Sequence, residues 1–349
     1  MRAGQGMARP ASHLTAETMA PKTPLANTSP TLFSSPVMLV AGLLSATLWS
    51  VLGLPLIFIK GIASLALAPV QLFLTKSQYK GAKVEHGDGY ALVTGASSGI
   101  GADIARDLAR RGFDLIIVAR RVELLETLAV ELSALALKHA KRKIDIKTIA
   151  RDLSKPEQVT SLCTELADTP VVILVNNAGF GGGGFFCEQP FANIAGMVEV
   201  NVRSLTELTH FFLQDMVRAG RGHVLQVASI AAFAAGPGEA TYHATKAYVL
   251  SLSDGLNYEL RATGVSVTSL CPGPVATPFF ETAGTTKSLI AQLPLALSSE
   301  YVANAGLDAM FARRPMVIPG ISMKLMYATV TMMPRLFAVW FNAAAWSEI

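Results

Sequence analysis

Two side chains of one predicted helix carry groups that can pass a proton to a reacting carbonyl. Tyr242 and Lys246 are four residues apart, a spacing that places both on the same face of a helix. A carbonyl that accepts a hydride develops charge on its oxygen and needs a proton. The pKa of a free phenol is about 10, and a neighbouring ammonium lowers it by stabilising the phenolate. The pair therefore suits proton transfer in carbonyl reduction or in alcohol oxidation.

A glycine-rich loop lies far upstream of this pair. Residues 94–101 read TGASSGIG and join a predicted strand to a predicted helix. The Gly-x-x-x-Gly-x-Gly spacing departs from the Gly-x-Gly-x-x-Gly fingerprint, but its physics is the same. Gly95 permits a tight turn, Gly99 lets a pyrophosphate approach the backbone, and Gly101 lets the helix pack close to the sheet. The N-terminus of that helix then offers free N–H groups to the anion.

The scaffold for these groups is a predicted series of alternating strands and helices that begins at Tyr90. Apolar runs bounded by turn residues predict the strands, and a 3.6-residue periodicity predicts the helices. Such alternation is typical of an α/β fold with a doubly wound, Rossmann-type parallel sheet covered by helices on both faces. The predicted strands are 90–94, 113–119, 144–150, 171–175, 223–228, 265–270 and 316–319, and the predicted helices are 99–112, 121–139, 155–167, 192–219, 241–262 and 299–312.

The glycine-rich octapeptide and the Tyr–Lys pair together resemble the short-chain dehydrogenase/reductase family of the classical type, from about residue 90 to about residue 320. The resemblance implies a nicotinamide cofactor. It also implies that Ser229 bonds the substrate oxygen and that Asn201 holds a water in a proton relay from Lys246. The expected catalytic residues are Asn201, Ser229, Tyr242 and Lys246.

The same resemblance assigns the contacts with the cofactor. Asp152 matches the position that contacts the adenine amino group, residues 176–179 line the adenosine pocket, and residues 272–277 approach the nicotinamide. For Asn176 a purely structural role is an equal alternative. The expected cofactor-binding residues are Gly95, Ser97, Ser98, Gly99, Ile100, Gly101, Arg120, Asp152, Asn177, Ala178, Gly179, Tyr242, Lys246, Pro272, Gly273, Val275 and Thr277.

The end of the second predicted strand bears on the choice of cofactor. Arg120 and Arg121 stand where NAD-binding members of the fold carry an acid, and Glu123 follows only after both. A guanidinium binds the 2′-phosphate that a carboxylate would repel. The sequence therefore favours NADP(H) over NAD(H), and two solvated surface arginines are the alternative.

The segment 278–297 predicts an apolar lid over the substrate. A second loop, Gly181 to Gly184, either leaves room for a bulky substrate or is simply flexible. The apolar lid residues are Phe279, Phe280, Leu289, Ile290, Leu293 and Leu295. A small lipophilic carbonyl or alcohol is the expected substrate, of the acyl thioester, steroid or retinoid type. A non-catalytic NADP(H)-binding protein and an epimerase or dehydratase on the same scaffold are the alternatives, and the complete catalytic set argues against the first.

The two ends of the chain fall outside this pattern. Residues 1–35 are rich in Ala, Ser, Thr and Pro and predict a disordered tail or a transit peptide. Residues 36–83 predict a membrane anchor, because the uncharged run 36–59 exceeds the roughly 20 residues that cross a bilayer as a helix; a pair of packed helices is the alternative. The catalytic domain is expected at 84–320, in the cytoplasm. The apolar tail 321–349 predicts an amphipathic helix on a bilayer or over the mouth of the active site.

Composition narrows the classes of partner. Charged residues make up 15% of the 349 residues, against about 25% in typical globular proteins, which agrees with a membrane partner. Seven basic residues and one acid precede Val84, so the rest of the chain is close to neutral and predicts no nucleic-acid partner. The three cysteines, without paired spacing, predict neither a disulfide framework nor a metal site. The long helices 192–219 and 241–262 resemble those that form dimers or tetramers in the family.

Overall fold

The computed structural model describes residues 84–345, except 287, 289–291 and 293. The predicted tail 1–35 and the predicted anchor 36–83, with its helical extension, lie outside the described residues. Within the part that is described, no helix is both long and apolar enough to cross a membrane.

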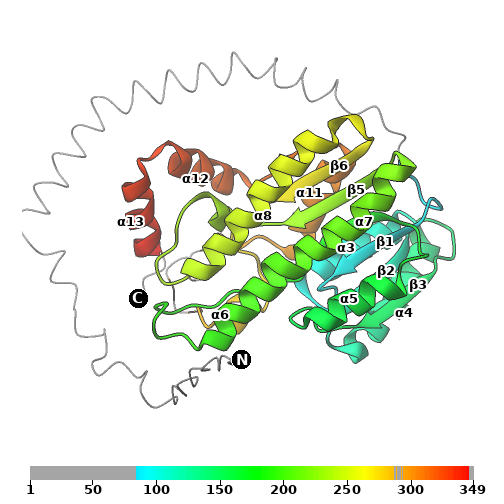
Figure 1. Ribbon diagram of the computed structural model, residues 1–349, viewed down its shortest axis with the longest axis horizontal. Helices are drawn as coiled ribbons and strands as arrows, with labels where there is room; N and C mark the ends of the chain where they lie inside the picture. The colour runs from blue at the N-terminus through cyan, green and yellow to red at the C-terminus, as the bar shows by residue number, and fades with distance from the viewer. Residues whose placement is uncertain (1–83, 287, 289–291, 293, 346–349) are drawn as a thin grey trace, which may run out of the picture. The chain divides into compact units, whose positions relative to one another are not determined.

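The described chain is built around a sheet of parallel strands, as the sequence predicts (Figure 1). Seven strands pair in the order β3-β2-β1-β4-β5-β6-β7, so the chain starts at the centre and winds outward in both directions. The carboxyl ends of β1 and β4, the neighbours at which the winding reverses, open a crevice where such folds bind ligands. The strands are β1 (Tyr90–Thr94), β2 (Asp114–Ala119), β3 (Ile146–Ala150), β4 (Val171–Asn176), β5 (Gly222–Val227), β6 (Val265–Leu270) and β7 (Met316–Val317).

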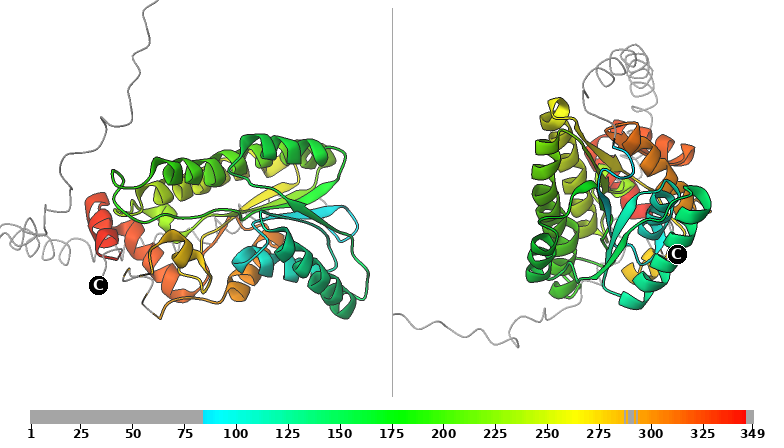
Figure 2. Two further views of the ribbon diagram at one scale, coloured as in Figure 1. Left: turned by 90° about the horizontal axis from the view of Figure 1, so that it is seen from below. Right: turned by 90° about the vertical axis from the view of Figure 1, so that its right-hand side faces the viewer.

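Helices cover both faces of the sheet (Figure 2). Successive residues of a strand point to opposite faces, so β1 sends Leu92 into one core and Val93 into the other. One face carries α3 (Gly99–Arg110), α4 (Val122–His139) and α11 (Ser299–Phe311). The other carries α5 (Pro156–Glu165), α7 (Leu205–Ala219) and α8 (Ala240–Glu259). The central strands β4, β5 and β6 are buried along their whole length, which explains the continuous apolar run of β4.

The long helix expected at 192–219 is not one regular α-helix. It consists of α6 (Phe191–Val198), a π-helical turn η5 (Glu199–Ser204) and α7. A π-turn holds one extra residue per hydrogen-bonded ring, and such turns often occur at functional sites. The candidate catalytic residue Asn201 lies inside this one.

The apolar tail folds into two further helices, α12 (Ile321–Met332) and α13 (Arg335–Ala345). Pro334 separates them, as expected for a residue that cannot continue a helix. α12 follows β7 directly and packs near the 3₁₀ turn η6 (Ile230–Phe233) that comes after β5. The tail therefore returns to the carboxyl edge of the sheet.

Candidate active site

One cavity of about 840 Å³ lies at the carboxyl edge of the sheet. It collects both sets of residues that the sequence predicts, the catalytic group and the cofactor group. Of all the predicted site residues, only Gly101 and Asn201 do not line it. Its volume is within the range of about 300–1,000 Å³ that is common for small-molecule and cofactor sites.

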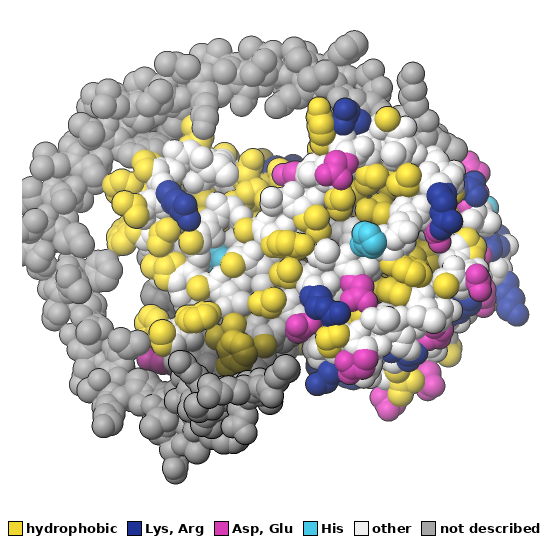
Figure 3. Space-filling model, in the orientation of Figure 1, with side chains coloured by type: hydrophobic (Ala, Val, Ile, Leu, Met, Phe, Trp, Pro, Cys, Tyr) yellow, Lys and Arg dark blue, Asp and Glu magenta, His cyan; other side chains and the backbone are white. Residues whose placement is uncertain are grey.

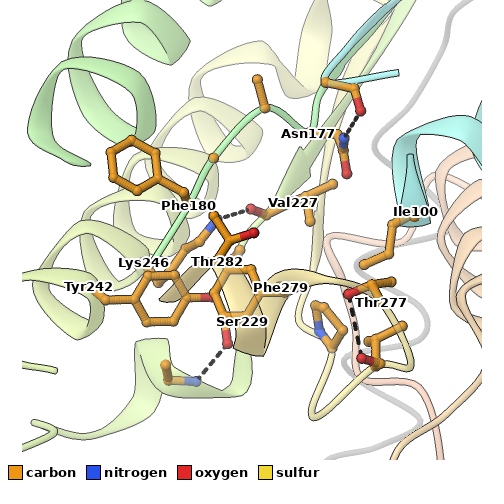
Figure 4. Close-up of a pocket in the computed structure, with 18 of the residues that line it drawn as sticks. Ile100, Asn177, Phe180, Val227, Ser229, Tyr242, Lys246, Thr277, Phe279 and Thr282 are labelled. Atoms are coloured by element: carbon orange, nitrogen blue, oxygen red, sulfur yellow. Dashed lines mark hydrogen bonds between the residues drawn. The ribbon is translucent and has the colours of Figure 1, made fainter. Parts of the chain in front are cut away.

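Three of the predicted catalytic side chains meet inside this cavity (Figure 4). Tyr242 and Lys246 extend from the first turns of α8, one turn apart, and Ser229 follows β5 directly. Ser229 forms a hydrogen bond with the Tyr242 phenol. Its Oγ also accepts a hydrogen bond from the backbone N–H of Ala231, at 3.1 Å, which caps η6 and fixes the serine.

The electrostatics of the pair differ from the sequence-based expectation. Burial raises the pKa of Tyr242 well above its usual value, against the lowering effect of the Ser229 hydrogen bond. Burial also lowers the pKa of Lys246 to about 8. The Lys246 ammonium lies 5.8 Å from the centre of the Tyr242 ring and donates to the Val227 carbonyl at 2.7 Å. Desolvation thus outweighs the expected stabilisation of the phenolate by the ammonium.

Asn201 lies just behind the cavity and ties three segments together. Its Oδ1 accepts a hydrogen bond from the Phe180 N–H at 3.1 Å, and its Nδ2 donates to the Phe180 carbonyl at 3.0 Å and to Thr245 Oγ1 at 3.1 Å. Thr245 is the residue next to Lys246. The amide therefore fixes the loop after β4 against α8, and its Oδ1 lies close to Gly179, which also approaches the Lys246 ammonium.

The glycine-rich loop suits the pyrophosphate of a dinucleotide. Gly95 and Gly99 have φ values of +64° and +57°, a backbone region that side-chain-bearing residues rarely adopt. The side chain of Ser98, the N-cap of α3, makes no capping hydrogen bond. The first N–H groups of α3 are thus free of a side-chain cap, as an anion at a helix N-terminus requires.

Gly101 and Asn177 form the support behind that loop. A Cβ at Gly101 would lie 2.3 Å from Asn177 Nδ2 and 2.5 Å from the Gly95 carbonyl oxygen. Asn177 Nδ2 donates to the carbonyls of Thr94 and Gly95 at 2.9 and 3.2 Å. The predicted close packing at Gly101 is therefore present, and the residue that it makes room for is Asn177.

Of the two arginines after β2, the second is held by the loop. Arg121 donates to Ser97 Oγ at 2.9 Å and to Ser98 Oγ at 3.3 Å, whereas Arg120 lines the cavity and exerts a positive field on Asp152. The sequence places both arginines at this position, and the structure shows that both line the cavity while only Arg121 is hydrogen-bonded to the serines of the loop.

The two polar residues after β3 and at the end of β4 have different roles. Asp152 lines the cavity, and its Oδ1 accepts hydrogen bonds from the N–H and hydroxyl of Ser154. Asn176 is buried and donates to Thr209 Oγ1 at 2.9 Å. The structural alternative for Asn176 is therefore the one that its contacts favour.

Comparison with known proteins agrees with this site. A family model for short chain dehydrogenases matches residues 89–288, which is more than half of the chain. The chain belongs to the short-chain dehydrogenase family. It is thus an oxidoreductase that works with a nicotinamide cofactor.

Individual members of the family show how far the likeness extends. A very-long-chain 3-oxoacyl-CoA reductase from Danio rerio is 32% identical over 192 residues, 54% of this chain and 60% of the relative. A short-chain dehydrogenase from Sphingobium yanoikuyae, solved in complex with NADPH, has a TM-score of 0.63 and 31% identity, and the match covers 69% of this chain and 92% of that one. A bulky-bulky ketone specific alcohol dehydrogenase from Comamonas testosteroni has a TM-score of 0.59 and 31% identity, covering 69% and 90%.

The part of the cavity beside Tyr242 is walled by apolar side chains in this short-chain dehydrogenase. The centres of the Phe279 and Tyr242 rings are 5.4 Å apart, and Phe180 packs against the same hydrophobic cluster. Phe279 begins the short helix α9 (Phe279–Ala283) inside the predicted lid. Phe280 and Leu295 of the lid also line the cavity, while Leu289, Ile290 and Leu293 are outside the described residues.

The C-terminal tail, residues 321–345, forms part of the cavity wall, which the sequence pattern only suggests. Side chains from both tail helices line the cavity: Met326, Tyr327 and Val330 from α12, and Phe341 and Asn342 from α13. Tyr327 packs edge-on against Phe233 at 4.5 Å, and Asn342 Nδ2 donates to the Ala235 carbonyl at 3.0 Å. Of the two expected positions for the tail, the one over the active-site mouth agrees with these contacts.

The four-glycine loop after β4 serves close packing. None of these glycines lines the cavity. A Cβ at Gly181 would lie 2.8 Å from Phe279 Cζ, and one at Gly183 would lie 2.3 Å from Thr285 Cγ2. The Gly183 N–H donates to the Ala283 carbonyl at 2.9 Å. The loop therefore seats α9, rather than leaving room for a bulky substrate.

Proposed function

We propose that this short-chain dehydrogenase transfers a hydride between NADP(H) and the carbonyl or secondary alcohol of a small lipophilic molecule, of the acyl thioester, steroid or retinoid type. The observation that carries the proposal is the cavity in which Ser229, Tyr242 and Lys246 lie between a dinucleotide cradle and an apolar, aromatic wall. The name of the Danio rerio relative, which refers to a 3-oxoacyl-CoA, agrees with this class of substrate.

In this proposal each catalytic side chain has one task. The nicotinamide, when bound, gives or takes the hydride. Tyr242 holds the proton that its phenol passes to the substrate oxygen, and Ser229 donates a hydrogen bond to that oxygen as charge develops on it. Lys246, with its lowered pKa of about 8, stabilises the phenolate left on Tyr242. Asn201 positions the loop and helix that hold Lys246.

The cofactor would lie along the cradle described above. Gly95, Ser97, Ser98, Gly99 and Ile100 would receive the pyrophosphate at the α3 N-terminus. The adenosine would lie between Asp152 and residues 177–179, and residues 272–277 would face the nicotinamide. Two observations support these assignments. The start of α3 has no side-chain cap, and Gly95 and Gly99 adopt the left-handed backbone conformation.

Preference for NADP(H) rests on the two arginines after β2. Arg120 lines the cavity, and Arg121 donates to the Ser97 hydroxyl of the loop, so in this proposal two guanidinium groups would flank the 2′-phosphate. An Arg120→Asp variant should move the ratio of kcat/KM values from NADPH toward NADH. An unchanged ratio in Arg120→Asp and in Arg121→Asp would remove both residues from that site.

A substrate screen tests the proposed activity. Full-length enzyme in detergent is given NADPH or NADH with 3-oxoacyl thioesters of several chain lengths, steroid ketones and retinal, and absorbance at the nicotinamide band is followed. Stoichiometric NADPH oxidation with a lipophilic carbonyl is expected. Product formation without net cofactor oxidation would indicate an epimerase or dehydratase instead, and cofactor binding without turnover would indicate a non-catalytic protein.

We also propose that residues 36–83 anchor the enzyme in a membrane, with the catalytic domain 84–320 and the tail 321–349 in the cytoplasm. The uncharged run 36–59 and the basic residues that follow it support this arrangement. A homodimer or homotetramer through the α7 and α8 helices is the proposed assembly, by resemblance to the family.

A further inference from the structure

The outward face of α13 is its apolar face. Leu336 is 83% exposed, Trp340 is 59% exposed and Phe337 is 41% exposed, whereas Ala338 on the opposite side is buried. Asn342, the uncharged polar residue of the helix, donates to the Ala235 carbonyl. A helix on the surface of a soluble domain normally presents its polar side to water. α13 does the reverse.

The preceding helix also exposes large apolar side chains, beside exposed polar ones. Ile321 and Leu325 of α12 are 74% and 63% exposed, while Met323 is buried against Gly273, which lines the cavity. Figure 3 shows hydrophobic side chains gathered over α12 and α13 around a basic one. We name this set of exposed side chains the tail face; it comprises Ile321, Leu325, Leu336, Phe337 and Trp340.

The charges beside the tail face have one sign. From residue 321 to residue 345 the sequence has two bases, Lys324 and Arg335, and no acid. Both bases are exposed. An apolar patch with basic residues and an interfacial tryptophan is the combination that binds anionic bilayers, since the apolar groups enter the acyl boundary and the bases meet the headgroups.

The inner sides of these helices form the wall of the active-site cavity. The cavity is lined by three apolar side chains of these helices that do not belong to the tail face: Met326, Val330 and Phe341. A bilayer against the tail face would therefore be separated from the substrate side of the cavity by the thickness of one helix layer.

We propose that the tail face docks on the surface of an anionic lipid bilayer and presents the mouth of the active site to it. This docking is additional to any anchoring by residues 36–83. A second copy of the chain or the uncharged run 36–59 could also cover an apolar face. Neither is favoured, because the run has no acid to pair with Lys324 and Arg335, and a second copy would bring the same two bases. If the tail face docks in this way, a lipophilic substrate can enter the site from the bilayer. That entry route rests on the proposed function, but the docking itself does not.

Tryptophan fluorescence tests the contact at one residue of the tail face. The chain has three tryptophans, Trp49, Trp340 and Trp346. A full-length Trp49→Phe/Trp346→Phe variant leaves Trp340 as the single reporter. It is mixed with phosphatidylcholine–phosphatidylserine vesicles, with or without brominated phosphatidylcholine as a quencher. We expect a blue-shifted Trp340 emission that the brominated lipid quenches.

Two further variants, made in the single-tryptophan background, separate docking from anchoring. Leu336→Glu should lose at least about half of the quenching, because it places a charge in the apolar contact. Val130→Glu is the matched control, since Val130 is 74% exposed on α4 and should leave the quenching unchanged. Replacing Lys324 and Arg335 with Glu should reduce the quenching on vesicles that contain phosphatidylserine.

Unquenched Trp340 emission from vesicle-bound enzyme would overturn the proposal. It would do so whether the tryptophan lies in water, is shielded by a second copy in a concentration-dependent way, or is shielded by residues 36–59. The quenching needs no substrate or cofactor. Its failure is therefore distinguishable from a failure of the proposed activity in the substrate screen.

Discussion

Tyr242 and Lys246 are both buried, yet burial moves their pKa values in opposite directions. A raised phenol pKa keeps the proton on Tyr242, which suits an acid that gives its proton only as charge develops on the substrate oxygen. A lowered ammonium pKa leaves Lys246 close to its midpoint near pH 8, which suits a residue that exchanges protons.

Removing the phenolic hydroxyl should abolish turnover and spare the cofactor site. For Tyr242→Phe we expect kcat to fall by roughly 10²–10⁴-fold, the usual contribution of a general acid, with cofactor affinity within about threefold of wild type. Steady-state kinetics and a cofactor titration measure the two quantities. Tyr248→Phe is the matched control on the same helix, since the Tyr248 hydroxyl bonds Thr206 and lies outside the cavity. Activity of Tyr242→Phe within tenfold of wild type would mean that another acid is used.

Glu239, the residue before α8, should make stability depend on pH. It is 1% exposed, neither of its carboxyl oxygens has a hydrogen-bond partner among the described residues, and burial raises its pKa from 4.5 to about 8. Between those values the folded chain keeps the proton that the unfolded chain has lost. The free energy of unfolding therefore falls as pH rises from about 5 to 8, by on the order of 4 kcal/mol.

A Glu239→Gln variant should remove that dependence, because an amide has no proton to lose in this range. Melting temperatures at pH 6 and pH 9 should differ less in the variant than in wild type, and the variant should be the more stable protein at pH 9. Glu126→Gln, at an exposed position of α4, is the control. Equal pH dependence in Glu239→Gln and wild type would show that Glu239 is not the titrating group.

At the residue scale, the spacing of residues in the sequence predicts their chemistry better than it predicts their environment in the fold. The interval of four residues places Tyr242 and Lys246 on one face of a helix, and the glycine-rich loop upstream is what makes the pair significant. Burial, which sets the pKa values of Tyr242, Lys246 and Glu239, depends on segments distant in sequence. The same holds for Arg121, whose contact with the glycine-rich loop brings together residues 24 positions apart.

At the scale of elements, two glycine positions give opposite expectations for the same substitution. Gly101→Ala would force its Cβ onto Asn177 and the Gly95 carbonyl, and overpacking of this kind costs about 1–3 kcal/mol. A Cβ at Gly255, on α8, would have nothing within 4 Å, so Gly255→Ala should stabilise the helix by up to about 1 kcal/mol.

Denaturation curves and a cofactor titration compare these two variants. Gly101→Ala should melt earlier and bind the dinucleotide at least about tenfold more weakly, because Asn177 can no longer hold the loop. Gly255→Ala should melt at the same temperature or later and bind normally. If Gly101→Ala retained full cofactor affinity, Asn177 would not be the support of the loop.

Most of the elements follow from the hydrophobic pattern, because strands such as β1, β2 and β4 are largely apolar and most helices have one apolar face. The pattern does not reveal the π-turn η5. An i→i+5 turn has no sequence period of its own, and this one contains Asn201, which is hydrogen-bonded to Phe180 and Thr245. The predicted strand at 316–319 is shorter than expected, Met316–Val317, because it pairs only with the end of β6.

At the scale of the whole molecule, the tail is the part that sequence predicts least. An apolar segment such as residues 321–345 must be covered, but its composition does not say by what. Only the packing of α12 beside η6, and the hydrogen bond from Asn342 of α13 to Ala235, show that their inner side belongs to the active-site cavity.

Fractionation of cells tests the proposed anchor. Full-length protein should stay in the membrane fraction after carbonate extraction, because residues 36–59 are uncharged and long enough to cross a bilayer. A chain that starts near Lys83 should resist extraction less and still oxidise NADPH with a carbonyl substrate. Full-length protein found entirely in the soluble fraction would exclude the anchor and favour the alternative of packed helices.

The π-turn η5 makes the active site sensitive to the number of residues between α6 and α7. Deleting one residue from 199–204 could restore continuous α-helical hydrogen bonding across the junction. The deletion would rotate α6 relative to α7 by about 100°, the angle of one α-helical residue. Ala192, Asn193 and Gly196, which line the cavity, would turn away from it. Such a chain could keep its helical content and its core and still lose its site. The site therefore depends on the number of residues between α6 and α7, and not only on which residues they are.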